Sequence, residues 1–165
     1  MNSVIFEEIR DEHVPVVLEI YTYYVLHSTA TFHIHIPSMD EMRDMTFFAD
    51  PRFRTYVIRA DEQIIGYAIL SRHKIRDAYD ATAEITIYLR PEYAGQGIGG
   101  QAISFMEEWA AKQKFHVIVS SICGQNHSSI KLFKKHGYFE CAHYREVGYK
   151  FGQYLDVVVF QKILP

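Results

Sequence analysis

Hydrophobic and polar positions alternate in the first residues of the chain and then change period. Residues 4–9 follow the two-residue repeat of a β-strand. Beyond Asp11, which we expect to cap a helix, apolar residues recur at helical spacing, at Val14, Val17, Leu18, Tyr21 and Val25. The pattern therefore predicts a strand followed by an amphipathic helix.

A second helix is predicted after Pro37 and Ser38, a pair that is typical of a helix start. It ends near residues 50–51 and carries large apolar side chains three positions apart, at Met39, Met42, Met45 and Phe48. Methionines at this spacing more often fill a core than form a binding groove. We therefore expect this row to pack in the interior.

The rest of the chain favours strands separated by two further helices. Strand-like runs on both sides of a polar turn predict an antiparallel hairpin over 55–60 and 64–71. A polar loop over 72–81 leads to a strong strand candidate at 83–89. The later elements are expected at 98–112 (helix), 115–122 (strand), 128–136 (helix ended by Gly137), 138–147 (strand) and 154–162 (strand). This order predicts one mixed α/β domain over residues 1–165.

Length and composition are those of an ordinary globular protein. The 165 residues, 48% of them hydrophobic and 22% charged, are enough for one sizeable core, and no repeat or low-complexity linker divides them. The net charge of −3 gives no general attraction to nucleic acid or to a membrane surface. Without a signal-peptide pattern or a membrane-spanning apolar run, we expect a cytoplasmic protein. Cys123 and Cys141 form no CxxC pair and are expected to be small core residues.

A glycine-rich segment follows the predicted strand 83–89 and reads Ala94-Gly95-Gln96-Gly97-Ile98-Gly99-Gly100. Glycines let backbone N–H groups approach an anion, and the helix start adds unpaired donors, so phosphate is the natural ligand. A dinucleotide-binding fold is not favoured, because five residues separate the strand from the loop and no acidic residue stands about 20 positions later. The Gly-Lys-Ser/Thr sequence of a P-loop is absent as well. The alternative is a flexible turn before a helix.

Other segments have their own recognisable patterns. Residues 90–99 are similar to the acetyl-CoA pyrophosphate loop, residues 126–138 to an Asn-x-x-Ser-Ile…Gly-Phe segment, and residues 148–156 to a Gly-x-Lys-x-Gly-x-Trp-x-Asp tail. Together they resemble the GNAT family of N-acetyltransferases, in particular its phosphinothricin acetyltransferase-like subgroup. Upstream matches extend the resemblance over nearly the whole chain, at Ile20-Tyr21, 28–32, 66–68, Ala78-Tyr79 and Glu84. The resemblance implies a GNAT-like α/β fold with a central, mostly antiparallel mixed sheet flanked by helices.

The resemblance also implies an activity. It points to acetyl-CoA-dependent N-acetylation of a small amino-acid-like acceptor, such as phosphinothricin, methionine sulfone or methionine sulfoximine, by direct attack in a ternary complex. A homodimer is implied too. Two other functions stay open: acetylation of a protein N-terminus, a lysine or a polyamine, and acyl-CoA sensing without catalysis. The sensor is motivated by Ala94, where the family has Arg or Gln, and by Phe133, where it has the His or Tyr that protonates the leaving thiolate.

Glu84 is the candidate general base. On a strand, Glu84, Thr86 and Tyr88 share one face, and Ile85, Ile87 and Leu89 share the other. The alternative role for Glu84 is an ion pair with an arginine. By resemblance, Asn126 is a second catalytic residue that places the pantetheine arm, whereas on its own it reads as a helix cap. The cofactor contacts implied by the resemblance are Ile87, Tyr88, Leu89, Gly95, Gln96, Gly97, Ile98, Gly99, Gly100, Asn126 and Ser129.

Four residues are assigned to the acceptor. Arg72 and Arg76 have the chemistry to clamp a carboxylate, although surface arginines are common. Phe32 and Tyr79 are placed in the acceptor pocket by resemblance. His33, His35 and His73 suggest a metal, but no further ligand stands at a recognised zinc spacing, so we predict no metal. His136, next to Gly137, is expected at the end of a helix.

Overall fold

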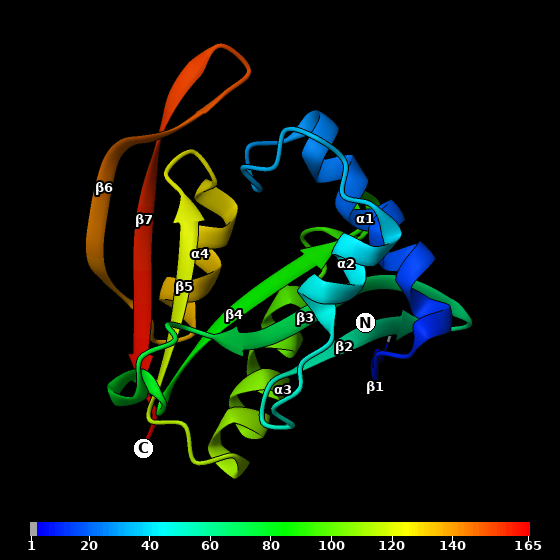
Figure 1. The fold of residues 1–165 in the computed structure, drawn as a ribbon, viewed down its shortest axis with the longest axis horizontal. Coiled ribbons are helices and arrows are strands. Elements are labelled where there is room, and N and C mark those ends of the chain that lie inside the picture. The colour runs from blue at the N-terminus through cyan, green and yellow to red at the C-terminus, as the bar shows by residue number, and fades with distance from the viewer. Residues whose placement is uncertain (1–2) are drawn as a thin grey trace.

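The protein is described from a computed structural model that covers residues 3–165. A seven-stranded sheet runs through the molecule in the order β1-β2-β3-β4-β5-β7-β6 (Figure 1). All neighbouring strands are antiparallel except β4 and β5, which are parallel. The strands are β1 (Ile5–Glu8), β2 (Arg54–Ala60), β3 (Gln63–Arg72), β4 (Thr82–Leu89), β5 (Val117–Cys123), β6 (Phe139–Lys150) and β7 (Gln153–Ile163). The predicted mixed, mostly antiparallel sheet is confirmed.

Helices cover both faces of this sheet. They are α1 (Val14–His27), α2 (Met39–Thr46), α3 (Ile98–Lys112) and α4 (His127–Lys135). The side chains of α1 and α2 form one core with Val57, Tyr67 and Ile69, whereas those of α3 and α4 form another with Ile58, Leu70 and Ile118 on the opposite face. The alternation predicted for β4 is confirmed, because Ile85 belongs to the α3 core and Tyr88 packs against the α1 core. Within residues 3–165, no helix has the length and apolar character to cross a membrane.

Three local expectations are wrong at the N-terminal helices. Asp11 does not cap α1: it begins a short 3-10 turn, and its carboxylate accepts a hydrogen bond from Nε of Arg43 at 3.0 Å. The second helix ends at Thr46, several residues earlier than predicted. Of its methionine row, Met42 is fully buried, whereas Met39, the first residue of the helix, is 38% exposed.

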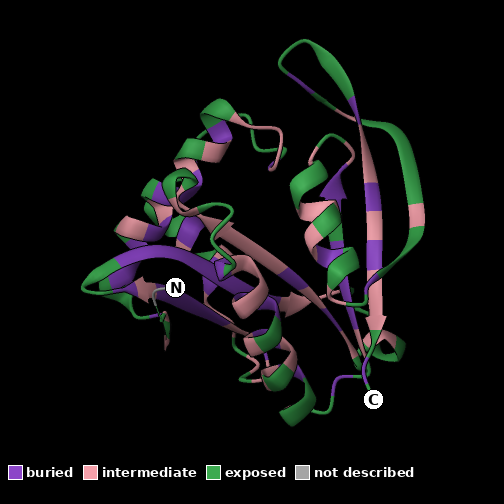
Figure 2. Ribbon diagram, turned by 180° about the vertical axis from the view of Figure 1, so that it is seen from behind, coloured by how far each residue is buried: buried purple, intermediate pink, exposed green. Residues whose placement is uncertain are grey.

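The outer strand β6 lies at the edge of the sheet and has little cover. Figure 2 shows this strand as almost entirely exposed, and only Lys150 along it is buried. Cys141 on β6 is therefore exposed, contrary to the sequence-based expectation, whereas Cys123 on β5 is buried as predicted. The same alternation of apolar and polar residues that predicts a strand does not reveal whether anything packs against it.

Candidate active site

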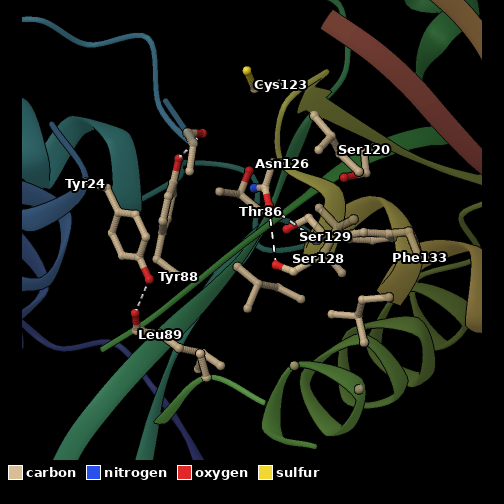
Figure 3. Close-up of a pocket in the computed structure, with 18 of the residues that line it drawn as sticks. Tyr24, Thr86, Tyr88, Leu89, Ser120, Cys123, Asn126, Ser128, Ser129 and Phe133 are labelled. Atoms are coloured by element: carbon tan, nitrogen blue, oxygen red, sulfur yellow. Dashed lines mark hydrogen bonds between the residues drawn. The ribbon is translucent and has the colours of Figure 1, made fainter. Parts of the chain in front are cut away.

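The central feature is a gap between the two parallel strands. β4 and β5 pair only over Thr82–Glu84 and Val117–Val119, and beyond that point each continues with its antiparallel neighbour alone. Residues 85–89 and 120–123 consequently face each other across a cavity of about 380 Å³ (Figure 3). In the part of the chain that the structure describes, the backbone groups on these two edges have no ladder partner across the gap. Such edges are suited to an extended ligand that brings its own amide groups.

The glycine loop closes one end of the cavity. Gly95 and Gly97 have positive φ angles of 76° and 80°, which favour glycine, and Gly97 occupies the N-cap of α3. Gly99 and Gly100 are required for a different reason, which is close packing against α4. A Cβ at Gly99 would come within 2.8 Å of Leu132 on α4, and a Cβ at Gly100 within 3.0 Å of His136 at the C-cap of that helix. The loop thus presents the free N–H groups of a helix start, with their partial positive charge, next to the cavity.

Most of the cofactor contacts predicted from the sequence line this cavity. They are Ile87, Tyr88, Leu89, Gly95, Gly97, Gly99, Gly100, Asn126 and Ser129. The side chains of Gln96 and Ile98 do not join them. The Gln96 amide donates to the carbonyl of Glu92 at 3.0 Å, and Ile98 is buried in the core under α3. Ala94 lines the cavity but has no polar side chain to offer a ligand.

The start of α4 forms the far wall. The Asn126 side chain accepts a hydrogen bond from the backbone N–H of Ser129 at 3.3 Å, so Asn126 is an N-cap, and it also lines the cavity. Ser120, Ser121 and Cys123 also line the cavity from β5, although the sequence predicts none of them to lie at a binding site. Two serines inside an otherwise apolar strand are the signal that could have identified them.

A group of tyrosines separates the cavity from α1. Tyr24 and Tyr88 line it together with Ala30. The hydroxyl of Tyr24 donates to the carbonyl of Leu89, and that of Tyr88 donates to the carbonyl of Ala30 at 3.3 Å. Burial raises the pKa of both Tyr24 and Tyr88 above the ordinary tyrosine value, so both are neutral hydrogen-bond donors. Tyr24 is not among the apolar positions at helical spacing, and nothing in the sequence indicates its position at a cavity.

Glu84 is the last β4 residue that pairs with β5. Its Oε1 lies 3.1 Å from Nδ1 of His73, so its polar partner is a histidine and not the arginine of the alternative reading. The ring of His73 meets that of Tyr79 edge to face, with centroids 5.6 Å apart. The structure therefore brings Tyr79, His73 and Glu84 together at the point where the two strands separate.

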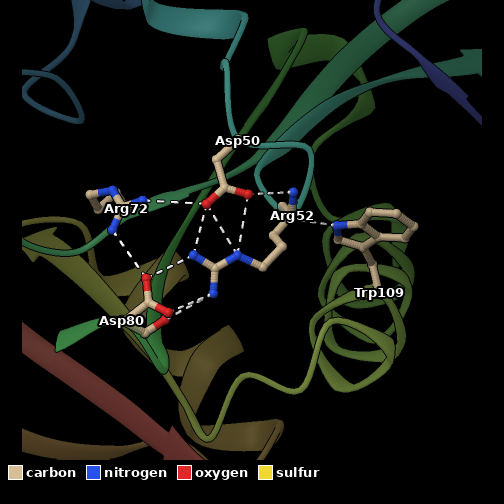
Figure 4. A network of polar contacts seen from close by, with 5 residues as sticks. All are labelled: Asp50, Arg52, Arg72, Asp80 and Trp109. Atoms are coloured by element: carbon tan, nitrogen blue, oxygen red, sulfur yellow. Dashed lines mark hydrogen bonds and ion pairs between the residues drawn. The ribbon is translucent and has the colours of Figure 1, made fainter. Parts of the chain in front are cut away.

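The arginine clamp expected from the sequence is not supported at Arg72. Its guanidinium lies 3.3 Å from Asp50 and 3.4 Å from Asp80, in a network centred on Arg52 (Figure 4). Arg52 donates to both of these carboxylates at 2.7 Å and holds the pKa of each below its ordinary value. Arg72 thus pairs with two carboxylates, which compete with a substrate carboxylate for its guanidinium. Arg76 is exposed in the same polar loop.

The remaining candidates have structural partners as well. Phe32 is 37% exposed and packs its ring against Gly148 on β6. His33 bonds the hydroxyl of Tyr21, and His136 is the C-cap residue of α4, as expected. Phe133 lines the cavity, is 5% exposed and meets Tyr138 edge to face at 5.0 Å. The phenyl ring at this position carries no proton donor.

Known proteins resemble this chain over most of its length. A family model described as the acetyltransferase (GNAT) family matches residues 17–138. Phosphinothricin N-acetyltransferase of Streptomyces coelicolor is 29% identical over 159 residues, which cover 93% of this chain and 92% of that protein. The L-methionine sulfoximine/L-methionine sulfone acetyltransferase of Salmonella typhimurium is 28% identical over 148 residues, which cover 88% of this chain and 85% of the relative.

A solved structure agrees with the sequence relatives. The GNAT superfamily phosphinothricin acetyltransferase from Sinorhizobium meliloti, solved in complex with acetyl-CoA, superimposes with a TM-score of 0.92 and 28% identity, over 98% of this chain and 88% of that one. The divergent strands, the glycine loop at the start of α3 and the family match over residues 17–138 lead to one conclusion. This chain belongs to the GNAT family of acetyltransferases.

Proposed function

We propose that the protein transfers the acetyl group of acetyl-CoA to the α-amine of a small amino-acid-like acceptor of the phosphinothricin, methionine sulfone or methionine sulfoximine type. The observation that carries the proposal is the cavity between β4 and β5, in a chain whose named relatives of this type align over 88% or more of its length. The relatives' names support the acceptor class, and the cavity supports the proposed place of transfer.

The residues of the cavity fit acetyl-CoA. The start of α3, with Gly95 and Gly97, suits the pyrophosphate, because free N–H groups and the helix dipole both favour an anion. The open edge of β4 over residues 87–89 suits the amides of the pantetheine arm, and Asn126 and Ser129 face it from α4. Bound there, the cofactor supplies an acetyl group activated as a thioester.

Glu84 is the proposed base, and Asn126 the proposed orienting residue. An ammonium group must lose a proton before it attacks, and in the proposal the Glu84 carboxylate at the junction of β4 and β5 takes it, directly or through water. His73 holds this carboxylate in place. The amine nitrogen then bonds to the acetyl carbon as the carbon–sulfur bond breaks, and the second N–H proton of the amine passes through water to the leaving thiolate, because the phenyl ring of Phe133 has no proton to give. Direct attack in a ternary complex needs no covalent enzyme intermediate.

Phe32, Tyr79 and Arg76 are the proposed acceptor contacts. Arg76 remains in the proposal because its side chain is exposed in the loop that carries Tyr79, whereas Arg72 is engaged by Asp50 and Asp80. One exposed guanidinium is enough to pair with the carboxylate of an amino acid. A polyamine acceptor has no carboxylate, so Arg76→Ala distinguishes the two acceptor classes. The substitution is expected to weaken binding of an amino acid but not binding of a polyamine.

The test is release of the CoA thiol from acetyl-CoA over a panel of free amino acids, polyamines and peptide amines. The panel includes phosphinothricin and methionine sulfone, and Glu84→Gln is assayed beside the wild type. If the wild type turns over a carboxylate-bearing amino acid and Glu84→Gln does not, the result supports both the proposed acceptor class and Glu84 as the base. Turnover confined to peptides or polyamines contradicts the acceptor class. Tight acetyl-CoA binding without turnover of any amine supports the sensor instead.

We also propose that the protein is a homodimer that works in the cytoplasm. β6 is an exposed edge strand of 12 residues with large apolar side chains in solvent, among them Phe139 (50% exposed), Tyr144 (53%) and Val147 (60%). A second copy is the partner that would cover this face, since homo-oligomers form by self-complementary patches. Light scattering is expected to give twice the mass of 19.3 kDa, and Tyr144→Asp is expected to lower it. A monomeric wild type contradicts the dimer.

The free thiols of Cys123 and Cys141 suit a reducing compartment, as the cytoplasm is.

A further inference from the structure

Lys150 is a buried cation at the end of β6. The residue is only 3% exposed, and its Nζ donates hydrogen bonds to three backbone carbonyls: Ser28 at 2.7 Å, Thr31 at 2.8 Å and Tyr24 at 3.3 Å. Two of these acceptors lie in the last turn and at the C-cap of α1, where the helix dipole favours a positive charge. An ammonium group with all three donors on carbonyls ties this piece of chain firmly to β6.

Lys150 lies next to the cavity, because Tyr24, whose carbonyl it binds, is one of the lining residues. Burial lowers the pKa of Lys150 below its ordinary value, and Cys123 of the cavity wall is near enough to affect it. Among residues 3–165 no acidic side chain forms an ion pair with Lys150, and a buried charge in this situation is costly to keep, so its three carbonyl contacts have to be maintained together. The far end of the β6–β7 hairpin therefore lies directly beside the segment that follows α1 (Figure 1).

Gly148 makes a second contact between the same two segments. It lies two residues before Lys150 on β6, so both residues point to the same face of the strand. A Cβ at Gly148 would overlap the ring of Phe32, the residue that follows Thr31. Only a glycine lets the Phe32 ring lie this close to the strand. The hairpin thus holds residues 28–31 by hydrogen bonds and seats Phe32 by close packing.

Residues 28–32 are held from the other side by tyrosines. The hydroxyl of Tyr88 donates to the carbonyl of Ala30 at 3.3 Å, and the hydroxyl of Tyr21 lies 2.6 Å from Oγ1 of Thr31. Ala30 itself lines the cavity. The segment therefore borders the cavity at Ala30, has no regular secondary structure of its own, and is fixed between β4 and the end of β6.

We propose that Lys150 and Gly148 are positioning residues that set the acceptor wall of the cavity by fixing residues 28–32. The assignment of this wall to the acceptor rests on the proposed function. Neither residue touches the reacting atoms: Lys150 acts through the carbonyls of Ser28 and Thr31, and Gly148 acts through Phe32. The far end of the hairpin, although remote in sequence from α1, determines how the acceptor side is shaped.

The experiment compares Lys150→Met, Lys150→Arg, Gly148→Ala and the control Lys162→Met. Lys162 is a matched control because it lies on β7 of the same hairpin and its Nζ donates to Glu107 and to the carbonyl of His136, away from residues 28–32. For each variant, KM is measured separately for the amino acid and for acetyl-CoA. Hydrogen exchange of the peptide that covers residues 26–34 is recorded on the same samples.

We expect Lys150→Met to raise the KM of the acceptor by about tenfold, with the KM of acetyl-CoA changed by less than about twofold, because only one wall moves. Exchange in residues 28–32 becomes faster, Lys150→Arg restores part of both effects, and Gly148→Ala reproduces the selective change in the acceptor KM. Lys162→Met leaves both KM values as in the wild type. Equal changes in the two KM values, or none, overturn the proposal.

Two complications have decisive outcomes. If Lys150→Met does not fold, Gly148→Ala decides: a selective rise in the acceptor KM supports the proposal, and an unchanged KM overturns it. If the wild type turns over no amino acid, the proposed function fails, but hydrogen exchange still tests whether Lys150 and Gly148 position residues 28–32. Faster exchange of residues 28–32 in Gly148→Ala and Lys150→Arg then supports it, and unchanged exchange in both overturns it.

Discussion

Nδ1 of His73 lies 3.1 Å from Oε1 of Glu84, at the residue where β4 stops pairing with β5. The two side chains are 21% and 33% exposed, so both remain open to a substrate and to water. If Glu84 is the base, Glu84→Gln is expected to lower kcat by roughly 10²–10⁴-fold, since general-base catalysis contributes about that much. Steady-state kinetics with acetyl-CoA and the best amino acid of the panel measure the loss.

The controls separate chemistry from folding. Glu84→Gln is nearly isosteric and is expected to bind acetyl-CoA as the wild type does, by calorimetry. His73→Gln removes the partner of the carboxylate but leaves the base, so its kcat should fall less than that of Glu84→Gln. Retention of full kcat in Glu84→Gln would exclude this carboxylate as the base.

Asn126 combines a structural role with a proposed role in binding. Asn126→Ala removes the acceptor for the Ser129 N–H and is expected to lower the free energy of unfolding by about 1 kcal/mol. Asn126→Asp keeps the cap and is expected to keep stability. Both variants are expected to bind acetyl-CoA more weakly, because the amide N–H₂ group is lost in each. Urea denaturation and calorimetry measure the two quantities, and normal affinity in Asn126→Asp would leave Asn126 with the cap alone.

Gly66 allows β3 and β4 to approach each other at the cavity. Gly66 pairs with Leu89, and a Cβ would come within 2.6 Å of the Tyr88 carbonyl oxygen and of the Leu89 side chain. Because a backbone atom cannot yield easily, Gly66→Ala is expected to cost about 1–3 kcal/mol of stability, as overpacking does. The shift of residues 88–89 is also expected to weaken acetyl-CoA binding.

Ser71→Ala, at the other end of β3, is the control for Gly66→Ala. It adds no atom and is expected to change stability by less than about 0.5 kcal/mol. Thermal denaturation gives the stability of both variants. A Gly66→Ala protein as stable as the wild type would mean that β4 accommodates the methyl group without strain.

The ion-pair network around Arg52 is expected to support stability and not catalysis. Arg52 also accepts, through its backbone carbonyl, the indole N–H of Trp109 at 2.9 Å, so the network joins the loop before β2 to α3. Arg52→Met is expected to lower the melting temperature by roughly 2–4 °C, the scale of a modest loss in a protein of this size. The KM values are expected to stay unchanged, and a selective rise in the acceptor KM would instead connect the network with the acceptor.

The same network predicts an acid dependence. The pKa values of Asp50 and Asp80 lie below the ordinary 3.8 in the folded protein, mainly because Arg52 donates to both carboxylates. Their contribution is therefore fully present above pH 3.8 and is lost as the pH falls through the lowered values. The difference in stability between the wild type and Arg52→Met should shrink on acidification below about pH 4, which denaturation at several pH values measures. A difference independent of pH would show that the carboxylates are not its cause.

Local sequence determined the parts of the site that depend on near neighbours. The two faces of β4 follow from the two-residue period, and the N-cap role of Asn126 follows from its place before a helical pattern. Gly95 and Gly97 mark a loop with positive φ because few other residues adopt it. The resemblance added the family, because its motifs are spread over nearly the whole chain.

Tertiary structure decided what distant segments do to one another. Strand order places β7 between β5 and β6, which leaves β6 at the edge and exposes Cys141, and no local pattern contains that order. Arg72 looks free in the sequence, yet it pairs with Asp50 and Asp80 in space. Lys150 reaches carbonyls about 120 positions earlier in the chain, at Ser28 and Thr31. Periodicity and capping arise from neighbouring residues, whereas partners such as these are fixed only when the sheet has assembled and the cores have closed on both of its faces.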